Sequence, residues 1–560
     1  MAIKTPKAGA AAAAVLGAMI FWLIARAMAS AGAMPLIITL MDGLAAFLGF
    51  LAVVRIAKAL WLWLRIRALL RPSGLHGRVG GVETIMAHNI GLSHCNADAE
   101  GIPVGTQDNK RLTYWKGQGH MSLIAPTEMG KTASFSLNSC MSLGAQRNLV
   151  TTGKGAEVAV KTHKYRSQIL GQTVIIVDPW GEAARYDLPT HRFNPMGHLV
   201  SLAATRCRSL ADTCRAIAIA LKPEEAKASG ENKLFRSMAR HMITEVSRYL
   251  ALCEAEEGGN QCNPVHLYRT FCGAQSTLMD TFRAMQNCPD YDGAVSAAGF
   301  RFEGIFLDTP KTAQSFLTEV TDALAIYEPS GILAQSVQTS DFDPTDLKNP
   351  DGHGMTIHLV IPPGKALTHG AYIGLALDSL AIQALEAGRF YPRVTLLCDE
   401  FEQLFTGKWD TAERILKTGR SAGVNLISIV QELSGYAAYG DKASMWTTQP
   451  EVVMCWGVRD PKDAEAYAKR AGKQSVVHPS GSVRDNDDAL SSTLKEEGVD
   501  MMRPDQFLHM RPFQAAVFYK QNPPFLVDLV HVKSVKPWAD YIDDLPDAQP
   551  EADFPIRFQA

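Results

Sequence analysis

The stretch MSLIAPTEMGKT, residues 121–132, decides the fold. Its first four residues suit a short buried strand, the next ones form a turn, and Gly130-Lys131-Thr132 stands where a helix would begin. The stretch matches the phosphate-binding loop pattern, except that Ala125 replaces the first glycine. It therefore predicts the strand–loop–helix unit of a nucleotide-binding α/β fold.

The loop itself is the expected nucleotide site. Backbone N–H groups in the turn and at the helix start wrap the phosphates in such loops. Lys131 is expected to be catalytic, because its charge reaches the β- and γ-phosphates, and the Thr132 hydroxyl is expected to bind Mg²⁺. The expected nucleotide-binding residues are Ala125, Pro126, Thr127, Gly130, Lys131 and Thr132. ATP and Mg²⁺ are thus the expected cofactors; a chance Gly-Lys-Thr is the alternative, which the flanking strand and helix disfavour.

A second apolar run, VTLLC at residues 394–398, ends in two acids. Asp399 is expected to hold Mg²⁺ through its water shell, and Glu400 is expected to polarise the attacking water as general base. The alternative is a pair of exposed acids at a strand end. That alternative is weak when a phosphate loop lies upstream in the same sheet.

Two further residues are expected to act in catalysis. Gln431 follows the apolar run 424–430, where a neutral amide can sense the γ-phosphate and orient water. Arg420 lies in the loop before that run, where it could reach a neighbour's nucleotide in a ring. Ordinary surface hydrogen bonding is the alternative for both.

Short apolar runs alternate with helical stretches along most of the chain. Such runs are typical of a buried parallel sheet, so we expect a doubly wound α/β domain. The expected strands are residues 121–124, 148–152, 173–177, 355–361, 394–398, 424–430 and 451–456. No strand pattern occurs between about 199 and 349, which predicts an all-α insertion there.

The first seventy residues are expected to form a membrane anchor. Residues 8–25 carry no charge and residues 27–54 carry only Asp42, so each segment can cross a bilayer. Both flanks are basic, which places both ends in the cytoplasm. A cleaved signal peptide is the alternative, but the apolar region is too long for one and a second apolar segment follows at once.

Composition excludes several classes of protein. The chain has 560 residues, 47% of them hydrophobic and 20% charged, which excludes general disorder. A net charge of −2 excludes a uniformly basic nucleic-acid binder. The ten cysteines include no C-x-x-C pair, so a zinc ribbon is not expected. From Val535 onward, Pro and acidic residues predict an extended tail.

These patterns divide the chain into five expected parts. They are a transmembrane hairpin at 1–70, the first part of the nucleotide-binding domain at 71–198, the all-α insertion at 199–349, the second part of the nucleotide-binding domain at 350–534, and the acidic tail at 535–560.

Several motifs in this order resemble those of the coupling proteins of type IV secretion systems, the TraG/TraD-like ring ATPases of conjugation. The pieces that carry the resemblance are APTEMGK at 125–131, VDPWG at 177–181, FNP at 193–195, IPP at 361–363, CDEF at 398–401, GRSAG at 419–423 and IVQ at 429–431. The resemblance runs from the membrane segments to about residue 530.

The resemblance implies a RecA-like P-loop NTPase domain with an inserted all-α domain and an N-terminal two-helix membrane anchor. It implies a homo-hexamer at the bacterial inner membrane, with several spans and the soluble domains in the cytoplasm. The implied partners are single-stranded DNA with its relaxase, or protein effectors, together with other inner-membrane components of the secretion system. ATP hydrolysis would drive transfer of the substrate.

Two departures from the family pattern bear on the turnover rate. Glu128 and Met129 stand where the family usually has small or basic residues, and an acid close to phosphates is unfavourable. In the segment TGKGAE at 152–157, Lys154 and Gly155 match the family, but the acid is displaced.

Two rival functions remain open from the sequence. One is a receptor for protein effectors with weak or no ATP turnover. The unusual loop residues Glu128 and Met129 favour this alternative. The other is a membrane-anchored DNA pump of the chromosome-segregation type, which usually has more membrane spans and a winged-helix tail. Conjugative DNA transfer is the favoured reading.

Overall fold

The computed structural model describes most of the chain. The described residues are 8–32, 34–69, 71, 85–87, 92–95, 101–223, 231–404, 408–480 and 493–542. The chain divides into two compact units, one of Met1–Gly81 with Ala471–Met502 and one of Val82–Arg470 with Arg503–Ala560. Each unit is described by itself below.

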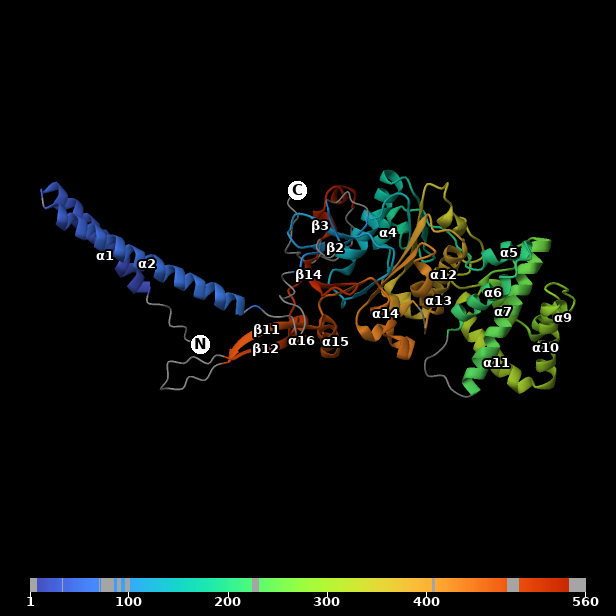
Figure 1. Cartoon of the computed structure of the whole chain (residues 1–560). Helices are drawn as coiled ribbons and strands as arrows, with labels where there is room; N and C mark the ends of the chain where they lie inside the picture. Colours follow the sequence, from blue (N-terminus) through green and yellow to red (C-terminus); the bar gives the residue numbers. More distant parts are fainter. Residues whose placement is uncertain are drawn as a thin grey trace. The chain divides into compact units, whose positions relative to one another are not determined.

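A parallel sheet forms the centre of the larger unit (Figure 1). Its strands, in spatial order, are β10 (Val452–Cys455), β4 (Met121–Ile124), β9 (Val424–Val430), β8 (Arg393–Cys398), β5 (Arg147–Lys154), β7 (Met355–Ile361) and β6 (Thr173–Val177). All adjacent pairs in this part are parallel. The structure confirms the seven expected strands: six lie inside the sheet and β6 forms its edge. Continuous apolar runs are typical of parallel strands whose two faces are both covered.

An antiparallel part that the sequence analysis missed extends the same sheet beyond β10. It consists of β1 (Ser93–Cys95), β3 (Leu112–Trp115), β2 (Ile102–Thr106), β14 (Phe525–Asp528) and β13 (Gln514–Tyr519), in this spatial order. β13 and β14 form a hairpin around Asn522-Pro523-Pro524. That turn sequence between two apolar runs was the available signal.

Several helices and one long central helix flank the sheet. They are α3 (Leu137–Ser142), α4 (Glu157–Lys164), α12 (Ala366–Glu386), α13 (Asp410–Arg414), α14 (Met445–Thr448), α15 (Pro461–Ala471) and α16 (Pro504–Leu508). Helix α12 is buried along most of its length, because it packs against β7 on one side and α6 on the other. Its apolar character all round fits this sandwiched position.

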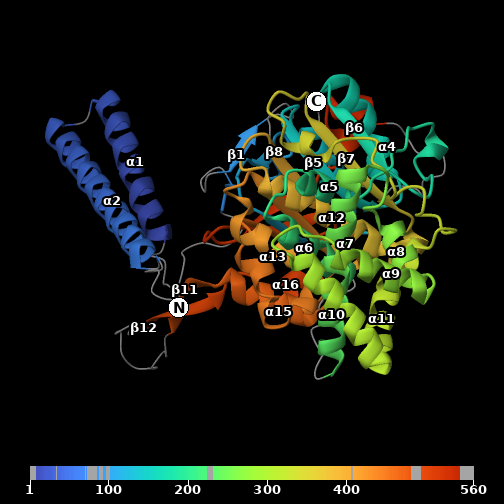
Figure 2. The ribbon, with the colours of Figure 1, turned by 90° about the vertical axis from the view of Figure 1, so that its right-hand side faces the viewer.

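The insertion is helical, as expected. Its helices are α5 (Gly197–Ala204), α6 (Leu210–Leu221), α7 (Glu231–Glu257), α8 (Pro264–Cys272), α9 (Gln275–Gln286), α10 (Ala294–Asp308) and α11 (Pro310–Leu324). The described part of residues 197–354 contains no strand. Figures 1 and 2 show these helices gathered beyond α12, on one side of the sheet. The domain limits at 199 and 349 stay predictions.

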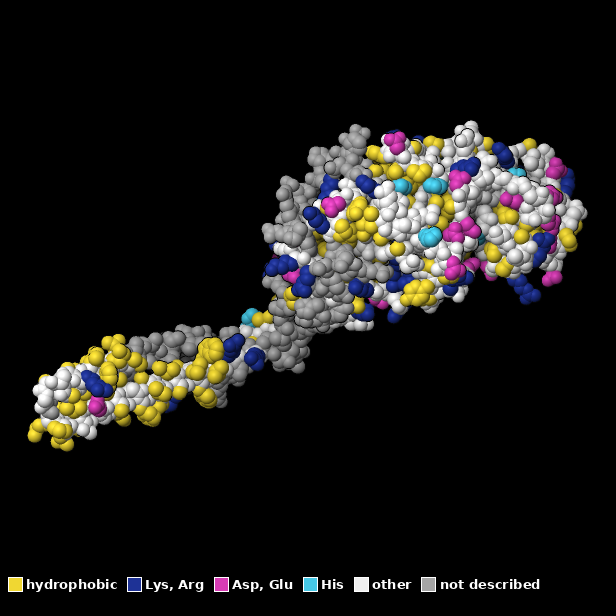
Figure 3. Space-filling model, turned by 90° about the horizontal axis from the view of Figure 1, so that it is seen from above, with side chains coloured by type: hydrophobic (Ala, Val, Ile, Leu, Met, Phe, Trp, Pro, Cys, Tyr) yellow, Lys and Arg dark blue, Asp and Glu magenta, His cyan; other side chains and the backbone are white. Residues whose placement is uncertain are grey.

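The smaller unit contains a helical hairpin and a two-stranded ribbon. Helices α1 (Ala8–Ser30) and α2 (Pro35–Leu69) pack along each other, and hydrophobic side chains cover much of the face seen in Figure 3. Only Pro35–Trp61 is long and apolar enough to cross a membrane among the described residues; Val15–Ser30 is apolar but shorter. Strands β11 (Lys473–Ser480) and β12 (Thr493–Asp500) pair antiparallel.

The expected extended tail is wrong at its beginning. Val535 and Trp538 are buried, and Trp538 begins a short 3₁₀ helix that ends at Tyr541. Their apolar side chains join the main core together with Val532. The acidic composition of the tail as a whole hid this packing from the sequence analysis. The expectation for residues 543–560, including their acids, lies outside the described residues.

Candidate nucleotide site

The phosphate loop leaves β4 and turns sharply before a helical segment. The Ala125 N–H donates to the Val430 carbonyl at 3.0 Å, which ties the loop's start to the end of β9. Glu128 and Gly130 both have positive φ, 66° and 67°. A π-helical turn, Thr132–Ser136, then leads into α3. The backbone therefore bends as a phosphate-binding loop must, with Glu128 in a conformation that usually favours glycine.

The far side of the loop is held by residues after β10. The Trp456 indole N–H donates to the Met129 carbonyl at 2.9 Å. A Cβ on Gly457 would lie 2.7 Å from the Met129 sulfur, and Gly457 has φ 62°. A glycine is thus required where Met129 packs, and the unusual loop residue has a structural partner.

Lys131 reaches back over the loop. Its side chain is only 9% exposed, and its ammonium donates to the carbonyls of Ala125 at 2.9 Å and Pro126 at 3.3 Å. The charge is thus held in the mouth of the loop, where phosphate oxygens would compete with these two carbonyls. This position fits the role predicted for Lys131.

The strand order brings the two predicted acids to the same edge of the sheet. β8 lies next to β9, and β9 lies next to β4, so Asp399 and the loop both follow carboxyl ends of neighbouring parallel strands. Burial raises the pKa of Asp399 to about 6, with Lys131 opposing the shift and Glu400 adding to it. Asp399 and Lys131 are therefore close enough to feel one another's charge.

Glu400 adopts a left-handed conformation directly after the strand. Its φ is 51° and its ψ is 47°, and its N–H donates to the Asp399 carboxylate at 3.0 Å. Such a backbone conformation is unusual for a residue other than glycine and is found at functional sites. The Glu400 charge adds to the raised pKa of Asp399, so the two carboxyl groups lie close enough to interact.

Glu402 is a member of this site that the sequence analysis missed. Burial raises the pKa of its carboxyl, the Glu400 charge adds to the shift, and the Gln431 backbone N–H and Lys131 oppose it. Glu402 lies in the 3₁₀ turn Phe401–Gln403, just after Glu400. The third acid in the sequence D-E-F-E, residues 399–402, was the available signal.

Gln431 lies beside the phosphate loop, and its predicted role in sensing the γ-phosphate stays a prediction. The Thr127 hydroxyl donates to the Gln431 side-chain carbonyl at 3.2 Å. This contact joins the loop after β4 to the residue after β9. A change in the loop on nucleotide binding would therefore reach Gln431 directly.

The oxygen groups of the site suit Mg²⁺ when phosphates are also present. Thr132 supplies a hydroxyl and Asp399 a carboxylate, which are the hard ligands that Mg²⁺ takes. No group of three or more His, Cys, Asp or Glu that could hold a metal occurs among the described residues.

Arg420 does not join the site of its own chain. It precedes β9, whereas Gln431 follows it, and the seven-residue strand spans roughly 20 Å. The Arg420 side chain is 68% exposed, with its guanidinium 3.9 Å from the Glu451 carboxylate. The structure therefore separates Arg420 from Lys131 of the same chain, and its predicted role in catalysis stays a prediction.

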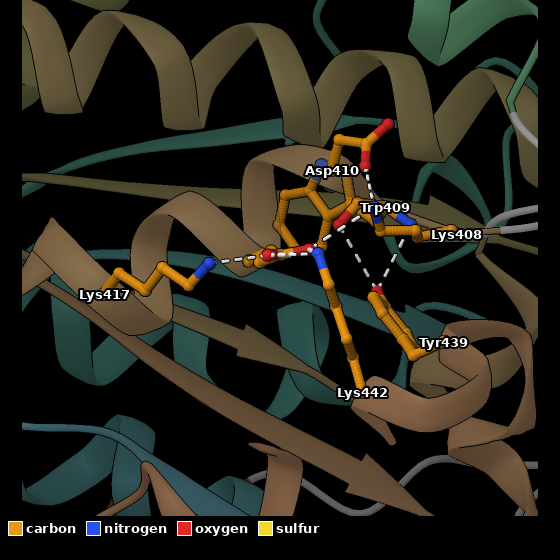
Figure 4. A network of polar contacts seen from close by, with 7 residues as sticks. Lys408, Trp409, Asp410, Lys417, Tyr439 and Lys442 are labelled. Carbon is orange, nitrogen blue, oxygen red and sulfur yellow. Dashed lines mark hydrogen bonds and ion pairs between the residues drawn. The ribbon is translucent and has the colours of Figure 1, made fainter. Parts of the chain in front are cut away.

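A carboxylate holds the segment that connects Glu400 with Arg420. Glu413 on α13 accepts contacts from Lys417 at 2.6 Å, Lys442 at 2.9 Å and Lys408 at 3.3 Å (Figure 4). Hydrogen bonds from Lys417 and Lys442 lower the pKa of Glu413 to about 2. This network joins α13 to the segment after Gln431.

Fold and site together define a P-loop nucleotide-binding protein. The family model described as "Type IV secretory system Conjugative DNA transfer" matches residues 88–529, more than half of the chain, and the chain belongs to this family. No curated protein matches this chain.

Solved structures of a conjugative coupling protein share the fold. The unbound monoclinic form of the bacterial conjugative coupling protein TrwBdeltaN70 has a TM-score of 0.56 at 15% identity, covering 77% of this chain and 87% of that one. TrwB with the non-hydrolysable ATP analogue ADPNP gives 0.53 at 17% identity, with the same coverage of both chains. TrwB with ADP and Mg²⁺ gives 0.54 at 16% identity, again with 77% and 87% covered.

Proposed function

We propose that this protein is an inner-membrane coupling ATPase that drives substrate transfer in conjugation by hydrolysing ATP. The observation that carries the proposal is the convergence of Lys131, Asp399 and Gln431 at one edge of the parallel sheet. The family assignment points the same way. TrwB, which is 16–17% identical to this chain, has been solved with the ATP analogue ADPNP and with ADP and Mg²⁺.

The residues divide the work of phosphoryl transfer. Lys131 leaves its two carbonyl acceptors and binds the β- and γ-phosphates, while the loop N–H groups hold the remaining oxygens. Thr132 and Asp399 would hold Mg²⁺, which would neutralise part of the phosphate charge. Glu400 accepts the proton of the attacking water. Gln431 orients that water, and its hydrogen bond with Thr127 couples it to the phosphate loop.

The proposed active assembly is a homo-hexameric ring. Arg420 lies on the edge of the sheet opposite the phosphate loop and is exposed, so one copy can present it to the nucleotide of the next. An arginine supplied in this way stabilises the charge of the transition state. The ring thereby makes hydrolysis in one copy depend on its neighbour.

The proposed location is the bacterial inner membrane, with two spans and the larger unit in the cytoplasm. Helix α2 satisfies the length and apolarity of a span, and α1 packs along it. The proposed cargo is single-stranded DNA with its relaxase, or protein effectors. Other inner-membrane proteins of the secretion system are the proposed partners.

The test is ATP hydrolysis by the full-length protein in detergent micelles, with and without single-stranded DNA. We expect turnover that DNA stimulates and that Glu400→Gln abolishes while nucleotide binding persists. In cells, Lys131→Ala is expected to abolish transfer and leave membrane insertion intact. Normal transfer frequency in that variant would refute the motor function.

A second candidate is a receptor for protein effectors with little turnover. Glu128 favours it, because its acidic side chain occupies a left-handed position within the phosphate loop. Replacement by glycine discriminates between the two. A receptor tuned by this acid would gain hydrolysis in Glu128→Gly, whereas a fully active motor would not. The chromosome-segregation pump receives no support from the family assignment.

A further inference from the structure

The residue after β10 holds the phosphate loop from one side. The Trp456 backbone N–H donates to the Ile124 carbonyl at 3.2 Å, which continues the pairing of β10 with β4 up to the residue before the loop. The Trp456 side chain is fully buried, and its indole N–H donates to the Met129 carbonyl at 2.9 Å. Trp456 therefore holds both the strand that precedes the phosphate loop and the loop itself.

The indole contact orients the peptide bond between Met129 and Gly130. In a trans peptide, the carbonyl oxygen and the following N–H point in opposite directions. Because the Met129 carbonyl is directed at Trp456, the Gly130 N–H faces away from Trp456. Backbone N–H groups are the phosphate donors of such loops, so the indole fixes the direction of one of them.

Helix α15 follows the same turn and carries a buried carboxylate. The helix has its own cap: the Asp460 carboxylate accepts from the Lys462 N–H at 2.9 Å, and Pro461 is the first helical residue. Asp463, in the first turn, is buried. Its carboxylate accepts from the Leu433 N–H at 2.9 Å. Asp463 thus forms its hydrogen bond outside its own helix.

The Leu433 N–H belongs to the first residue of the 3₁₀ segment Leu433–Lys442, which begins two residues after Gln431. Glu432 stands at the N-cap position, and its side chain makes no capping hydrogen bond. The first N–H groups of a helical segment have no partner within that segment. Asp463 therefore supplies, from another element, the acceptor that the N-cap residue does not provide.

Gln431 is held on both sides along the chain. The residue before it, Val430, accepts through its carbonyl from the Ala125 N–H at 3.0 Å. Two residues after it, the backbone N–H is held by Asp463. The Gln431 side chain itself accepts from the Thr127 hydroxyl at 3.2 Å. The phosphate loop, Gln431, α15 and the end of β10 thus form a closed circuit of contacts.

The acceptor in this circuit is an ionisable group. Burial raises the pKa of Asp463, the Leu433 N–H opposes the shift, and the charges of Asp460 and Glu432 add to it. A hydrogen bond to an ionised acceptor is about twice as strong as one between neutral groups. The ionised carboxylate therefore holds the Leu433 N–H more firmly than an amide or a hydroxyl would.

We propose that Trp456 and Asp463 are positioning residues for ATP hydrolysis, Trp456 for the phosphate loop and Asp463 for Gln431. Trp456 acts through the Met129 carbonyl, and Asp463 acts through the Leu433 N–H. The inference rests on the proposed function, in which the loop binds the phosphates and Gln431 orients the attacking water. Because one turn and the helix after it carry both residues, they fix Gln431 relative to the phosphate loop.

The first test is the ATPase kinetics of full-length Asp463→Ala in detergent micelles. Loss of the acceptor releases the chain after Gln431, and kcat is expected to fall roughly ten- to a hundredfold, because small misplacements of a positioned group have effects of this size. Affinity for ADPNP is expected to stay within about twofold, since the phosphate loop keeps its own contacts. Asp463→Asn retains an oxygen acceptor and should recover most of the lost kcat. An unchanged kcat in Asp463→Ala would overturn the role of Asp463.

A double variant separates positioning from a general structural role. Without the Gln431 side chain Asp463 has nothing to position, so Asp463→Ala should lower kcat far less in a Gln431→Ala background than in the wild-type protein. Glu465→Ala is the matched control, because it removes a carboxylate from the exposed face of the same helix. Its kcat is expected to stay within about twofold of wild type. Independent losses in the double variant, or an equal loss in Glu465→Ala, would overturn the proposal.

Nucleotide affinity tests Trp456 without any need for turnover. Trp456→Phe keeps an aromatic ring and removes the N–H that holds the Met129 carbonyl, so affinity for ADPNP is expected to fall about three- to tenfold. Trp446→Phe is the matched control, because Trp446 is equally buried and its indole N–H has no hydrogen-bond partner among the described residues. Its affinity is expected to stay within about twofold of wild type. Equal affinities of the two variants would overturn the role of Trp456.

These measurements distinguish failure of the inference from failure of the proposed function. A wild-type protein that hydrolyses ATP, together with a fully active Asp463→Ala, would refute the inference and leave the ATPase intact. A wild-type protein that binds ADPNP but hydrolyses no ATP would refute the ATPase and, with it, the role of Asp463. The affinities of Trp456→Phe and Trp446→Phe would still decide the role of Trp456.

Discussion

At the scale of single residues, Asp399 shows how the site is prepared for a cation. Asp399 as a residue is only 8% exposed, and its carboxylate lies near that of Glu400, yet it must be ionised to hold Mg²⁺. Burial raises its pKa from 3.8 to about 6. The folded chain therefore carries a charge that water would stabilise better, and metal binding relieves this.

This conflict predicts that Asp399→Asn stabilises the nucleotide-free protein at high pH. A pKa above the unfolded value means that ionisation destabilises the fold: the penalty is absent below pH 3.8, grows through pH 6, and is complete above it. The gain is at most about 3 kcal/mol. Thermal melts should show a higher Tm for the variant at pH 8 and a smaller difference at pH 4.5. A lower Tm at pH 8 would contradict the prediction.

At the scale of elements, the segment between β8 and β9 runs from the carboxyl ends of the parallel strands to their amino ends. It begins next to Glu400 and ends at Arg420, with α13 and a π-helical turn between them. Glu413 and its three lysines hold this segment. Its stability therefore affects both the general base and the arginine offered to a neighbour.

Glu413→Gln is predicted to destabilise the protein at neutral pH by about 1–2 kcal/mol, because three lysines lose their common partner. The depressed pKa fixes the pH range: this stability is present above pH 4.5 and is lost as pH falls through about 2. Denaturant unfolding at pH 7 and pH 3 measures both effects.

Glu386→Gln is the matched control for that experiment. Glu386 pairs with one partly exposed arginine, Arg414, so its loss is expected to change stability by less than about 0.5 kcal/mol. Equal effects of the two substitutions would show that the lysine network adds no stability.

At the scale of the whole molecule, the position of Arg420 makes the proposed ring testable. The Lys131→Ala variant lacks a working nucleotide site but keeps Arg420. The Arg420→Ala variant keeps the nucleotide site but lacks the arginine that it would offer to its neighbour. Each variant alone is expected to be inactive. Mixed assemblies should recover part of the ATPase activity, since some nucleotides then meet both residues. No recovery in assemblies that contain both variants would contradict action between copies.

The membrane anchor makes a second prediction at this scale. If α1 and α2 both span the bilayer, a reporter fused after Gly32 lies outside the cytoplasm and one fused after Leu69 lies inside it. Alkaline phosphatase, active only outside, and a fluorescent protein that folds only inside measure this. A cytoplasmic location for both fusions would show that α1 does not span the membrane.

Local patterns in the sequence determined the parallel strands, the phosphate loop and the helical insertion. Continuous apolar runs such as 355–361 can be satisfied only by burial on both faces, and their positions needed no knowledge of neighbours. The placement of the phosphate loop and Asp399 at the same end of the sheet also followed from parallel strands, whose carboxyl ends share one edge.

Contacts between distant parts of the chain were decided by the tertiary structure alone. Burial of Trp538 and the entry of Glu402 into the nucleotide site both depend on which surfaces meet. A residue's neighbours in sequence carry no record of those surfaces. Side-chain burial and charge environment are properties of the packed molecule, and they set the pKa of Asp399 as much as its own chemistry does.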